Sequence, residues 1–169
     1  MRIADRGSRI GHGSVYVAIV VAALGGYFIY QAWFNPSRAV KRRLGEIAGV
    51  LSVPDGEPEL ARVARLRGYL APDVRVRADG SEFANRDTIV GALAGLQPPK
   101  GGWNIQFVDV QVATDSESTA HAGLMLEINT HDPRTGEWLA DQHETIVNLQ
   151  KQNGEWVVVT AEIRSRSPR

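Results

Sequence analysis

An apolar run over residues 14–34 is the strongest pattern in this chain of 169 residues. It reads SVYVAIVVAALGGYFIYQAWF, with Gln31 as its only strongly polar side chain. About 20 such residues in a helix cross the hydrocarbon core of a bilayer. The run is longer than the core of a cleaved signal peptide, and a small domain could hardly bury a helix that is apolar all round. We therefore expect a transmembrane helix over residues 14–34.

Small side chains recur every fourth residue of this run and would form one stripe on a helix. Such a stripe lets a second transmembrane helix approach closely, either another copy of the chain or a different subunit. Small residues are also common in membrane helices that have no partner, so both interpretations stay open. The helix-packing positions are Ser14, Ala18, Ala22 and Gly26, with Gly25 beside them. The aromatic residues expected at one membrane–water interface are Tyr27, Tyr30, Trp33 and Phe34.

Basic residues flank the run on both sides and set its expected orientation. Residues 1–13 form a basic tail, and a denser basic cluster follows the run. The denser cluster favours a cytoplasmic domain by a small margin, with a periplasmic domain as the alternative. We expect a single-pass protein of the inner (plasma) membrane whose basic residues meet lipid headgroups. The residues of the cluster are Arg38, Lys41, Arg42 and Arg43.

The first of three predicted amphipathic helices follows directly. It begins at Asn35-Pro36, a good N-cap followed by a good first helical residue. We expect residues 35–57 to hold this juxtamembrane helix and a hinge, before a domain over residues 58–164 and a tail over residues 165–169. The apolar positions of the helix recur at helical spacing and are Val40, Leu44, Ile47 and Leu51.

The second and third helices are expected over residues 59–70 and 87–96, because their apolar residues also recur every three or four positions. The apolar face of the second helix carries Leu60, Val63, Leu66 and Leu70, and the arginines largely outside it are Arg62, Arg65 and Arg67. Ala71-Pro72-Asp73 ends the second helix, and a short strand over residues 74–78 then reaches a turn at Asp79-Gly80.

From Trp103 onward the apolar period changes to two, which is typical of strands. Asn153-Gly154 is a strong signal for a hairpin between the last two strands. Helices come first and a run of strands comes last, which predicts an α+β domain with helices on one face of a curved antiparallel sheet. The expected strands cover residues 103–112, 120–129, 138–149 and 156–163.

Three stretches of the domain carry a family resemblance: residues 69–74 (YLAPDV), 85–89 (NRDTI) and 153–159 (NGEWVVV). They resemble, in order, the end of a helix before the first strand, the Gly-Arg-Asp-x-Ile entry to the third helix and the final hairpin of the nuclear transport factor 2-like (NTF2-like) superfamily. That superfamily includes ketosteroid isomerase and SnoaL-like polyketide cyclases. Asn85 replaces the Gly of the family and also tolerates a left-handed backbone. The resemblance implies a cone-shaped fold and no particular function.

Members of the superfamily that catalyse reactions place a carboxylate or a His inside the cone. The resemblance puts Asp79 near the isomerase-like general base, although its surroundings also fit a tight turn. His121 and Glu127 share one face of a strand, and Asp141 and His143 share a face of the next. If these faces meet in the cone, a His–carboxylate pair could perform acid–base chemistry. If they face water, they are ordinary polar positions.

Composition narrows the chemistry further. The 19 residues that are Lys or Arg balance the 19 that are Asp or Glu, so the chain lacks the net positive charge that favours binding to nucleic acid. The absence of Cys excludes disulfides, thiol chemistry and thiolate metal sites. The pair Asp141-x-His143 has too few ligands for a closed zinc site, and no phosphate loop, nucleophile elbow or dinucleotide motif occurs. We expect no metal and no cofactor.

Two functions remain from the sequence. The first is a non-catalytic, membrane-anchored accessory subunit that docks onto a larger membrane complex through its transmembrane helix and its domain. The alternative is a membrane-tethered protein that binds a small molecule, or an isomerase- or cyclase-like enzyme, working in the cone. A deep apolar cone would favour the alternative, and a cone filled by side chains would weigh against it.

Overall fold

The computed structural model describes residues 20–23, 35–53, 59–96, 99, 101–132 and 134–165. The chain divides into two compact units, residues 1–35 and residues 36–169. In the first unit, residues 20–23 are helical. A search of the described residues finds no helix with the length and apolar character needed to cross a membrane. Most of the apolar run lies outside those residues, so the transmembrane helix stays a prediction.

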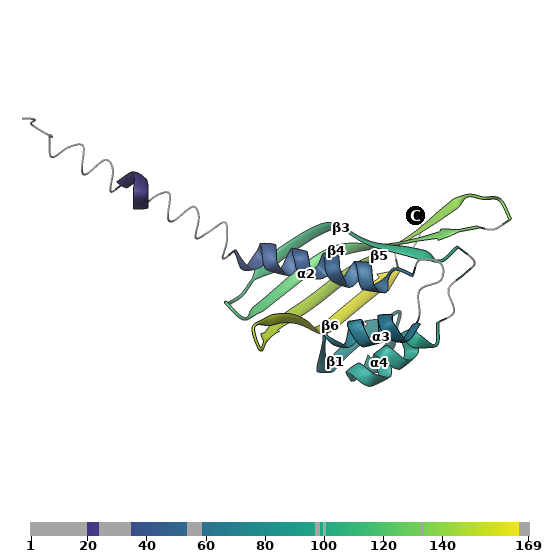
Figure 1. Ribbon diagram of the computed structural model, residues 1–169, viewed down its shortest axis with the longest axis horizontal. Helices are drawn as coiled ribbons and strands as arrows, with labels where there is room; N and C mark the ends of the chain where they lie inside the picture. The colour runs from purple at the N-terminus through teal and green to yellow at the C-terminus, as the bar shows by residue number, and fades with distance from the viewer. Residues whose placement is uncertain are drawn as a thin grey trace, which may run out of the picture. The chain divides into compact units, whose positions relative to one another are not determined.

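A six-stranded, strongly curved sheet forms the body of the second unit (Figure 1). The order of its strands is β2-β1-β6-β5-β4-β3. Neighbouring strands are antiparallel, except for β1 and β6, which run parallel. The strands are β1 (Leu70–Ala78), β2 (Ser81–Ala84), β3 (Trp103–Thr114), β4 (Thr119–His131), β5 (Trp138–Gln152) and β6 (Glu155–Ser165).

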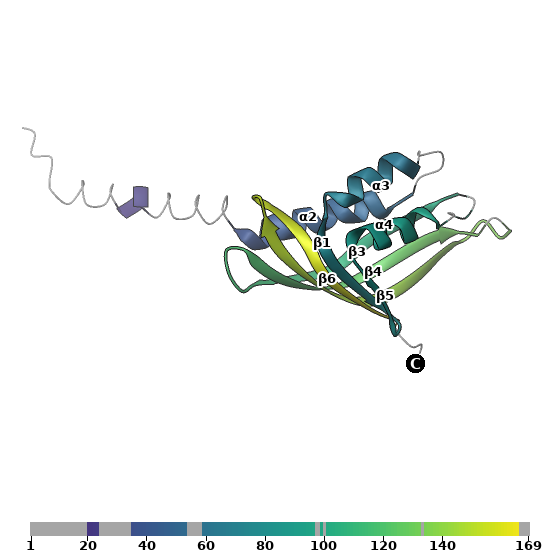
Figure 2. The same cartoon turned by 90° about the horizontal axis from the view of Figure 1, so that it is seen from below.

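Three helices cover the concave face of the sheet: α2 (Pro36–Leu51), α3 (Glu59–Arg67) and α4 (Arg86–Ala94). Figure 2 shows α3 and α4 side by side above the sheet, and α2 lies along β3 in both views. The convex face carries no helix from the described part of the unit. Helices on one face of a curved sheet are what the sequence predicted.

Helix α2 belongs to the core of this unit. Val40 and Leu44, at the centre of its apolar stripe, are 0% and 1% exposed. Val53, just after the helix, pairs with Trp103 of β3 through two backbone hydrogen bonds. The sequence predicts a juxtamembrane helix and a hinge over residues 35–57, before a domain that begins at residue 58, whereas the compact unit begins at Pro36. The reason is that the apolar stripe of α2 matches the apolar concave face of the sheet.

Local turn chemistry accounts for the turns that the sequence predicted. Asn153 and Gly154 both have positive φ (52° and 86°), as a two-residue hairpin requires. Asp79 and Gly80 also have positive φ (45° and 86°) in the turn between β1 and β2. Asn85 has φ 62°, and its side chain accepts a hydrogen bond from the backbone N–H of Thr88, which caps α4.

The strands differ from the sequence prediction in three respects. The sheet is mixed rather than antiparallel, because β1 pairs with β6 in parallel. Alternation of apolar residues shows which face is buried but does not show the direction of a partner that is distant in sequence. The short strand β2 was also missed: its four residues are all exposed, so they do not alternate between buried and exposed positions. Leu70, expected at the end of a helix, begins β1.

Candidate functional site

A cavity of about 490 Å³ lies between the concave face of the sheet and the three helices. This space is called the cavity in the following sections. Ile47 of α2, Leu66 of α3 and Leu93 of α4 line it from one side, and side chains of all six strands line it from the other. Phe83 and Leu96 are part of the lining and are 39% and 51% exposed, so the cavity reaches the surface where they lie.

The lining is apolar because alternate residues of each strand point to the same face. On β4, Leu126 and Ile128 point into the cavity, while Glu127 between them points to the convex face. Two lining residues carry polar side-chain atoms, and both atoms have partners. Trp103 donates its indole N–H to the carbonyl oxygen of Leu51 at 2.8 Å. The Thr145 hydroxyl donates to the carbonyl oxygen of His143 at 3.4 Å.

Arg43 of α2 lies at one end of the second unit, and its side chain is 16% exposed. Its guanidinium donates to the backbone carbonyls of Trp156 and Gly68, each at 2.9 Å. It also donates to the carboxylate of Glu155 at 2.9 Å and lies 4.0 Å from the centre of the Tyr69 ring. Arg43 therefore joins α2 to the start of both β1 and β6. We call this the Arg43 end.

The opposite end of β6 carries a polar cluster, the His143 cluster, made of Asp79, Asp141, His143 and Ser165. His143 Nε2 lies 3.0 Å from a carboxylate oxygen of Asp141, and its Nδ1 lies 3.4 Å from the Ser165 hydroxyl oxygen. That hydroxyl donates to Asp79 at 2.7 Å, and the Ser165 N–H donates to the same carboxylate at 3.1 Å. Three of the polar residues singled out in the sequence thus meet through Ser165.

The His143 cluster lies on the cavity side of the sheet. Asp141 and His143 precede the cavity-lining Thr145 at alternate positions of β5, so all three share one face. Opposite them, His143 pairs with Leu126 and Asp141 pairs with Ile128, both of which line the cavity. The cluster is therefore at the rim of the cavity rather than inside it.

The hydrogen bonds of the cluster link its members in a row. His143 Nε2 faces Asp141 and Nδ1 faces the Ser165 hydroxyl, whose proton goes to Asp79. The Ser165 hydroxyl can also turn to donate to Nδ1 when that nitrogen carries no proton. The side-chain and then the backbone hydrogen bond from Ser165 lower the pKa of Asp79, and the nearby His143 lowers it less.

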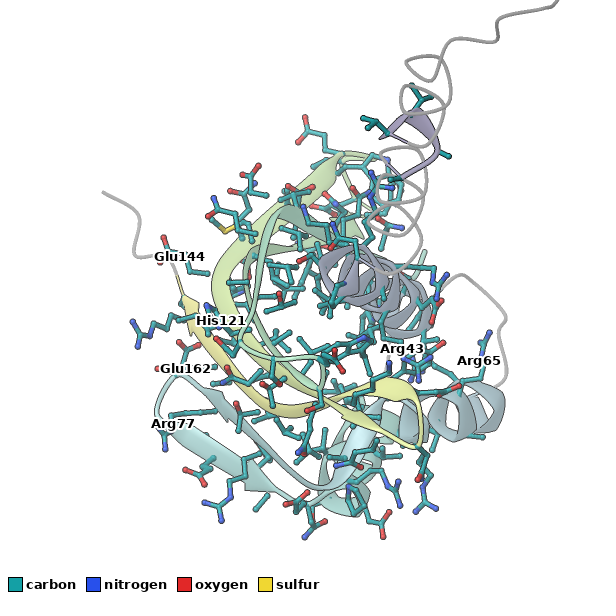
Figure 3. The ribbon with its side chains drawn as sticks, turned by 90° about the vertical axis from the view of Figure 1, so that its left-hand side faces the viewer. Arg43, Arg65, Arg77, His121, Glu144 and Glu162 are labelled. Atoms are coloured by element: carbon teal, nitrogen blue, oxygen red, sulfur yellow. The ribbon has the colours of Figure 1, made fainter. Side chains whose placement is uncertain are left out.

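His121 and Glu127 are not part of this site. His121 is exposed and lies near Asp115, 3.3 Å from its carboxylate, and Figure 3 shows it on the convex side of the sheet with Glu144 and Glu162. Glu127 accepts hydrogen bonds from Asn129 and Gln142, which lower the pKa of its carboxyl. Both belong to the polar convex face.

Arg62 was expected outside the apolar face of α3 but is 8% exposed. It lies four residues before Leu66, on the same side of the helix, and Leu66 lines the cavity. The sequence pattern placed Arg62 outside the apolar face because helical spacing alone does not show how wide the buried face of α3 is.

The residues expected at the membrane fall into two groups. Of the helix-packing residues only Ala22 is described; Ser14, Ala18, Gly25 and Gly26 lie outside the described residues, as do Tyr27, Tyr30, Trp33 and Phe34. In α2, Arg38, Lys41 and Arg42 are exposed, whereas Arg43 is engaged as described above. Among the described residues, no group of acidic or His side chains is arranged to hold a metal ion.

No family model matches the chain, and no curated protein matches it. A candidate scytalone dehydratase from Novosphingobium aromaticivorans is similar with a TM-score of 0.62 and 16% identity, over 76% of this chain and 83% of that one. An NTF2-like protein with a cystatin-like fold from the same organism is similar with a TM-score of 0.67 and 10% identity, over 86% and 92%.

The CaMKII hub homology domain of Chlamydamonas reinhardtii is similar with a TM-score of 0.64 and 14% identity, over 78% of this chain and 99% of that domain. At these identities the similarity concerns the fold alone. The domain has an NTF2-like α+β fold, as the three sequence stretches predicted.

Proposed function

We propose that this domain binds an apolar small molecule in the cavity and that the apolar run at residues 14–34 tethers the domain to a membrane. The observation that carries the binding proposal is the cavity itself, whose lining offers hydrocarbon and no titratable side chain among the described residues. Its volume of about 490 Å³ falls in the range of roughly 300–1,000 Å³ that is typical of small-molecule sites.

The energetics of an apolar cavity support this proposal. Lining atoms that face empty space lose dispersion contacts, which lowers the stability of the fold. A hydrocarbon ligand restores those contacts and also removes its own apolar surface from water. A polar ligand gains nothing comparable, because the polar atoms of Trp103 and Thr145 already have partners.

A variant that fills the cavity tests the proposal. Ala161 of β6 lines the cavity, so Ala161→Phe should occupy the space that a ligand needs. Ala113 is exposed on β3, so Ala113→Phe adds the same bulk outside the cavity. The full chain in lipid nanodiscs is titrated with dodecanol, with empty nanodiscs as the blank. We expect saturable binding by the wild type and Ala113→Phe, and at least tenfold weaker binding by Ala161→Phe.

Equal binding by all three proteins would place the dodecanol elsewhere, and no binding by the wild type would remove the proposal. The folded state of each variant is checked by its circular dichroism spectrum and thermal transition. A misfolded Ala161→Phe is replaced by Ala78→Leu, which adds a smaller side chain to the same wall.

The second candidate is the accessory subunit suggested by the sequence, in which the domain docks onto a larger membrane complex. The charged convex face favours it, because Glu144, Glu162 and Arg77 gather there and no element of the described part of the chain covers them (Figure 3). A structural neighbour is a kinase hub domain, which supports an assembling role for this fold. Purification of the chain from its membranes, with mass spectrometry of co-migrating proteins, tests this candidate: a lone chain would count against it.

A further inference from the structure

Three exposed side chains mark an opening in the wall of the cavity. Phe83 of β2 and Leu96, just after α4, line the cavity and are 39% and 51% exposed. Ala92, four residues before Leu96, also lines the cavity and is exposed. The other described residues of the lining are buried or half-buried. The cavity therefore opens between β2 and the end of α4, and we call this opening the mouth.

The opposite edge of the sheet is held against α2 by hydrogen bonds. β3 forms that edge, as β2 forms the edge at the mouth. The backbone N–H of Ile105 donates to the Ser52 hydroxyl at 2.9 Å, and the Trp103 indole N–H donates to the carbonyl oxygen of Leu51 at 2.8 Å. Val53 and Trp103 also exchange two backbone hydrogen bonds. These bonds close the cavity between α2 and β3.

The mouth lacks such bonds. Within the described part of the chain, no hydrogen bond joins β2 to residues 92–96. Strand β2 has four residues, all of them exposed, and β1 is its one neighbour in the sheet. An element with little buried surface and one neighbour opens at a lower free energy than the core. Motion that widens the cavity therefore costs least at the mouth.

We propose that a ligand enters and leaves the cavity through the mouth and that the side chain of Phe83 sets the rate of this passage. This inference rests on the proposed binding of an apolar molecule, and it adds the route of that molecule and a residue that controls its exchange. Phe83 is the residue of β2 that lines the cavity, so its ring lies beside the path. A barrier on the path slows entry and exit by the same factor and leaves the affinity unchanged.

The test compares the same substitution at two phenylalanines of the cavity. Phe83→Ala widens the mouth. Phe107→Ala is the matched control, because Phe107 is half-buried and lines the cavity from β3, at the other edge of the sheet. The full chain in lipid nanodiscs is mixed in a stopped-flow fluorimeter with aminoanthracene, a neutral aromatic probe that fluoresces more strongly in apolar surroundings. Displacement by excess dodecanol gives the dissociation rate constant, with empty nanodiscs as the blank.

We expect Phe83→Ala to raise the association and dissociation rate constants by about threefold or more, with a smaller change in their ratio. Leu96→Ala, on the other side of the mouth, should also raise both. Phe107→Ala should raise the dissociation rate constant alone, because it removes contacts with the ligand without widening the path. An unchanged association rate constant in Phe83→Ala would overturn the inference.

The outcomes for this inference and for the proposed function are distinct. Saturable binding by the wild type, with the same association rate constant in Phe83→Ala, would remove the role of the mouth and leave binding in the cavity intact. Saturable binding of neither aminoanthracene nor dodecanol would overturn both. The thermal transition of each variant shows whether it is folded. If Phe107→Ala does not fold, Phe83→Leu and Phe107→Leu replace the pair, with the same directions expected.

Discussion

The two ends of β6 use charged residues in opposite ways. At the Arg43 end, one guanidinium contacts two backbone carbonyls, the carboxylates of Glu46 and Glu155, and a ring, and its side chain is 16% exposed. At the other end, the His143 cluster consists of short side chains linked one to the next, and within the described part of the chain it makes no side-chain hydrogen bond to a backbone carbonyl of another segment. His143 is also 16% exposed, and its partner Asp141 is 73% exposed. The first arrangement holds three segments together. The second leaves groups within reach of a molecule in the cavity.

This difference teaches where polar residues stabilise the fold and where they remain available. Charged hydrogen bonds to backbone carbonyls contribute most when water is excluded from the donor. Pairs in which a partner is largely exposed contribute little, because water screens them and competes for them. The Arg43 end should therefore matter most for stability, and the His143 end should contribute less to stability and depend on pH through Asp79.

The largest expected effect is at Arg43. Arg43→Ala should lower the free energy of unfolding by about 2–3 kcal/mol, because it leaves the carbonyls of Trp156 and Gly68 without a donor. The neighbouring Arg42→Ala should cost less than about 0.5 kcal/mol, because the Arg42 side chain is 80% exposed. Urea unfolding followed by circular dichroism measures both. Equal losses from the two variants would show that the Arg43 contacts do not hold this end together.

A smaller effect is expected at His143. His143→Ala should lower the free energy of unfolding by about 0.5–1 kcal/mol, because it breaks contacts with largely exposed partners. Its effect on dodecanol binding should be small, since the hydrocarbon lies against Thr145 and its apolar neighbours. A loss of stability as large as that of Arg43→Ala would contradict the contrast between the two ends.

The effect of pH provides a finer test of the His143 end. Hydrogen bonds from Ser165 lower the pKa of Asp79 in the folded protein. Asp79 therefore stabilises the fold above its unfolded pKa, and this contribution disappears as the pH falls through the lowered folded value. Asp79→Asn should melt below the wild type at pH 7 and approach it near pH 2. A constant difference in melting temperature across this range would rule out the carboxylate as the cause.

The smallest expected effect is the energetic coupling between substitutions at the two ends of β6. Arg43 and His143 share no partner and lie near opposite ends of β6. The losses from Arg43→Ala and His143→Ala should therefore add to within about 0.5 kcal/mol in the double variant. A larger deviation in urea unfolding would show that the cluster and the Arg43 contacts form a single network.

The sequence predicted those parts of the fold that depend on local chemistry. Asn85, Asn153-Gly154 and Asp79-Gly80 were assigned correctly, because positive φ and capping depend on the residues present at the turn. The parallel pairing of β1 with β6 was not predicted, because nothing local specifies a partner so far along the chain. The place of α2 in the core was missed for the same reason.

The site was predicted only in part. Asp79, Asp141 and His143 could be named, but Ser165, which joins them, lies at the end of the last strand with no motif to mark it. Arg62 was placed outside the apolar face, because spacing along a helix does not show how wide the buried face is. The cavity was also out of reach, because apolar alternation looks the same whether the space it faces is filled or empty.

The most direct test of binding in the cavity is to identify the molecules that remain bound when the protein is purified from cells. The full chain is extracted from its membranes in a styrene–maleic acid polymer, together with the Ala161→Phe and Ala113→Phe variants. Small molecules are then quantified by mass spectrometry. We predict one apolar molecule at close to one equivalent in the wild type and in Ala113→Phe, and a several-fold loss in Ala161→Phe. The same molecules in the same amounts in all three proteins would contradict the account.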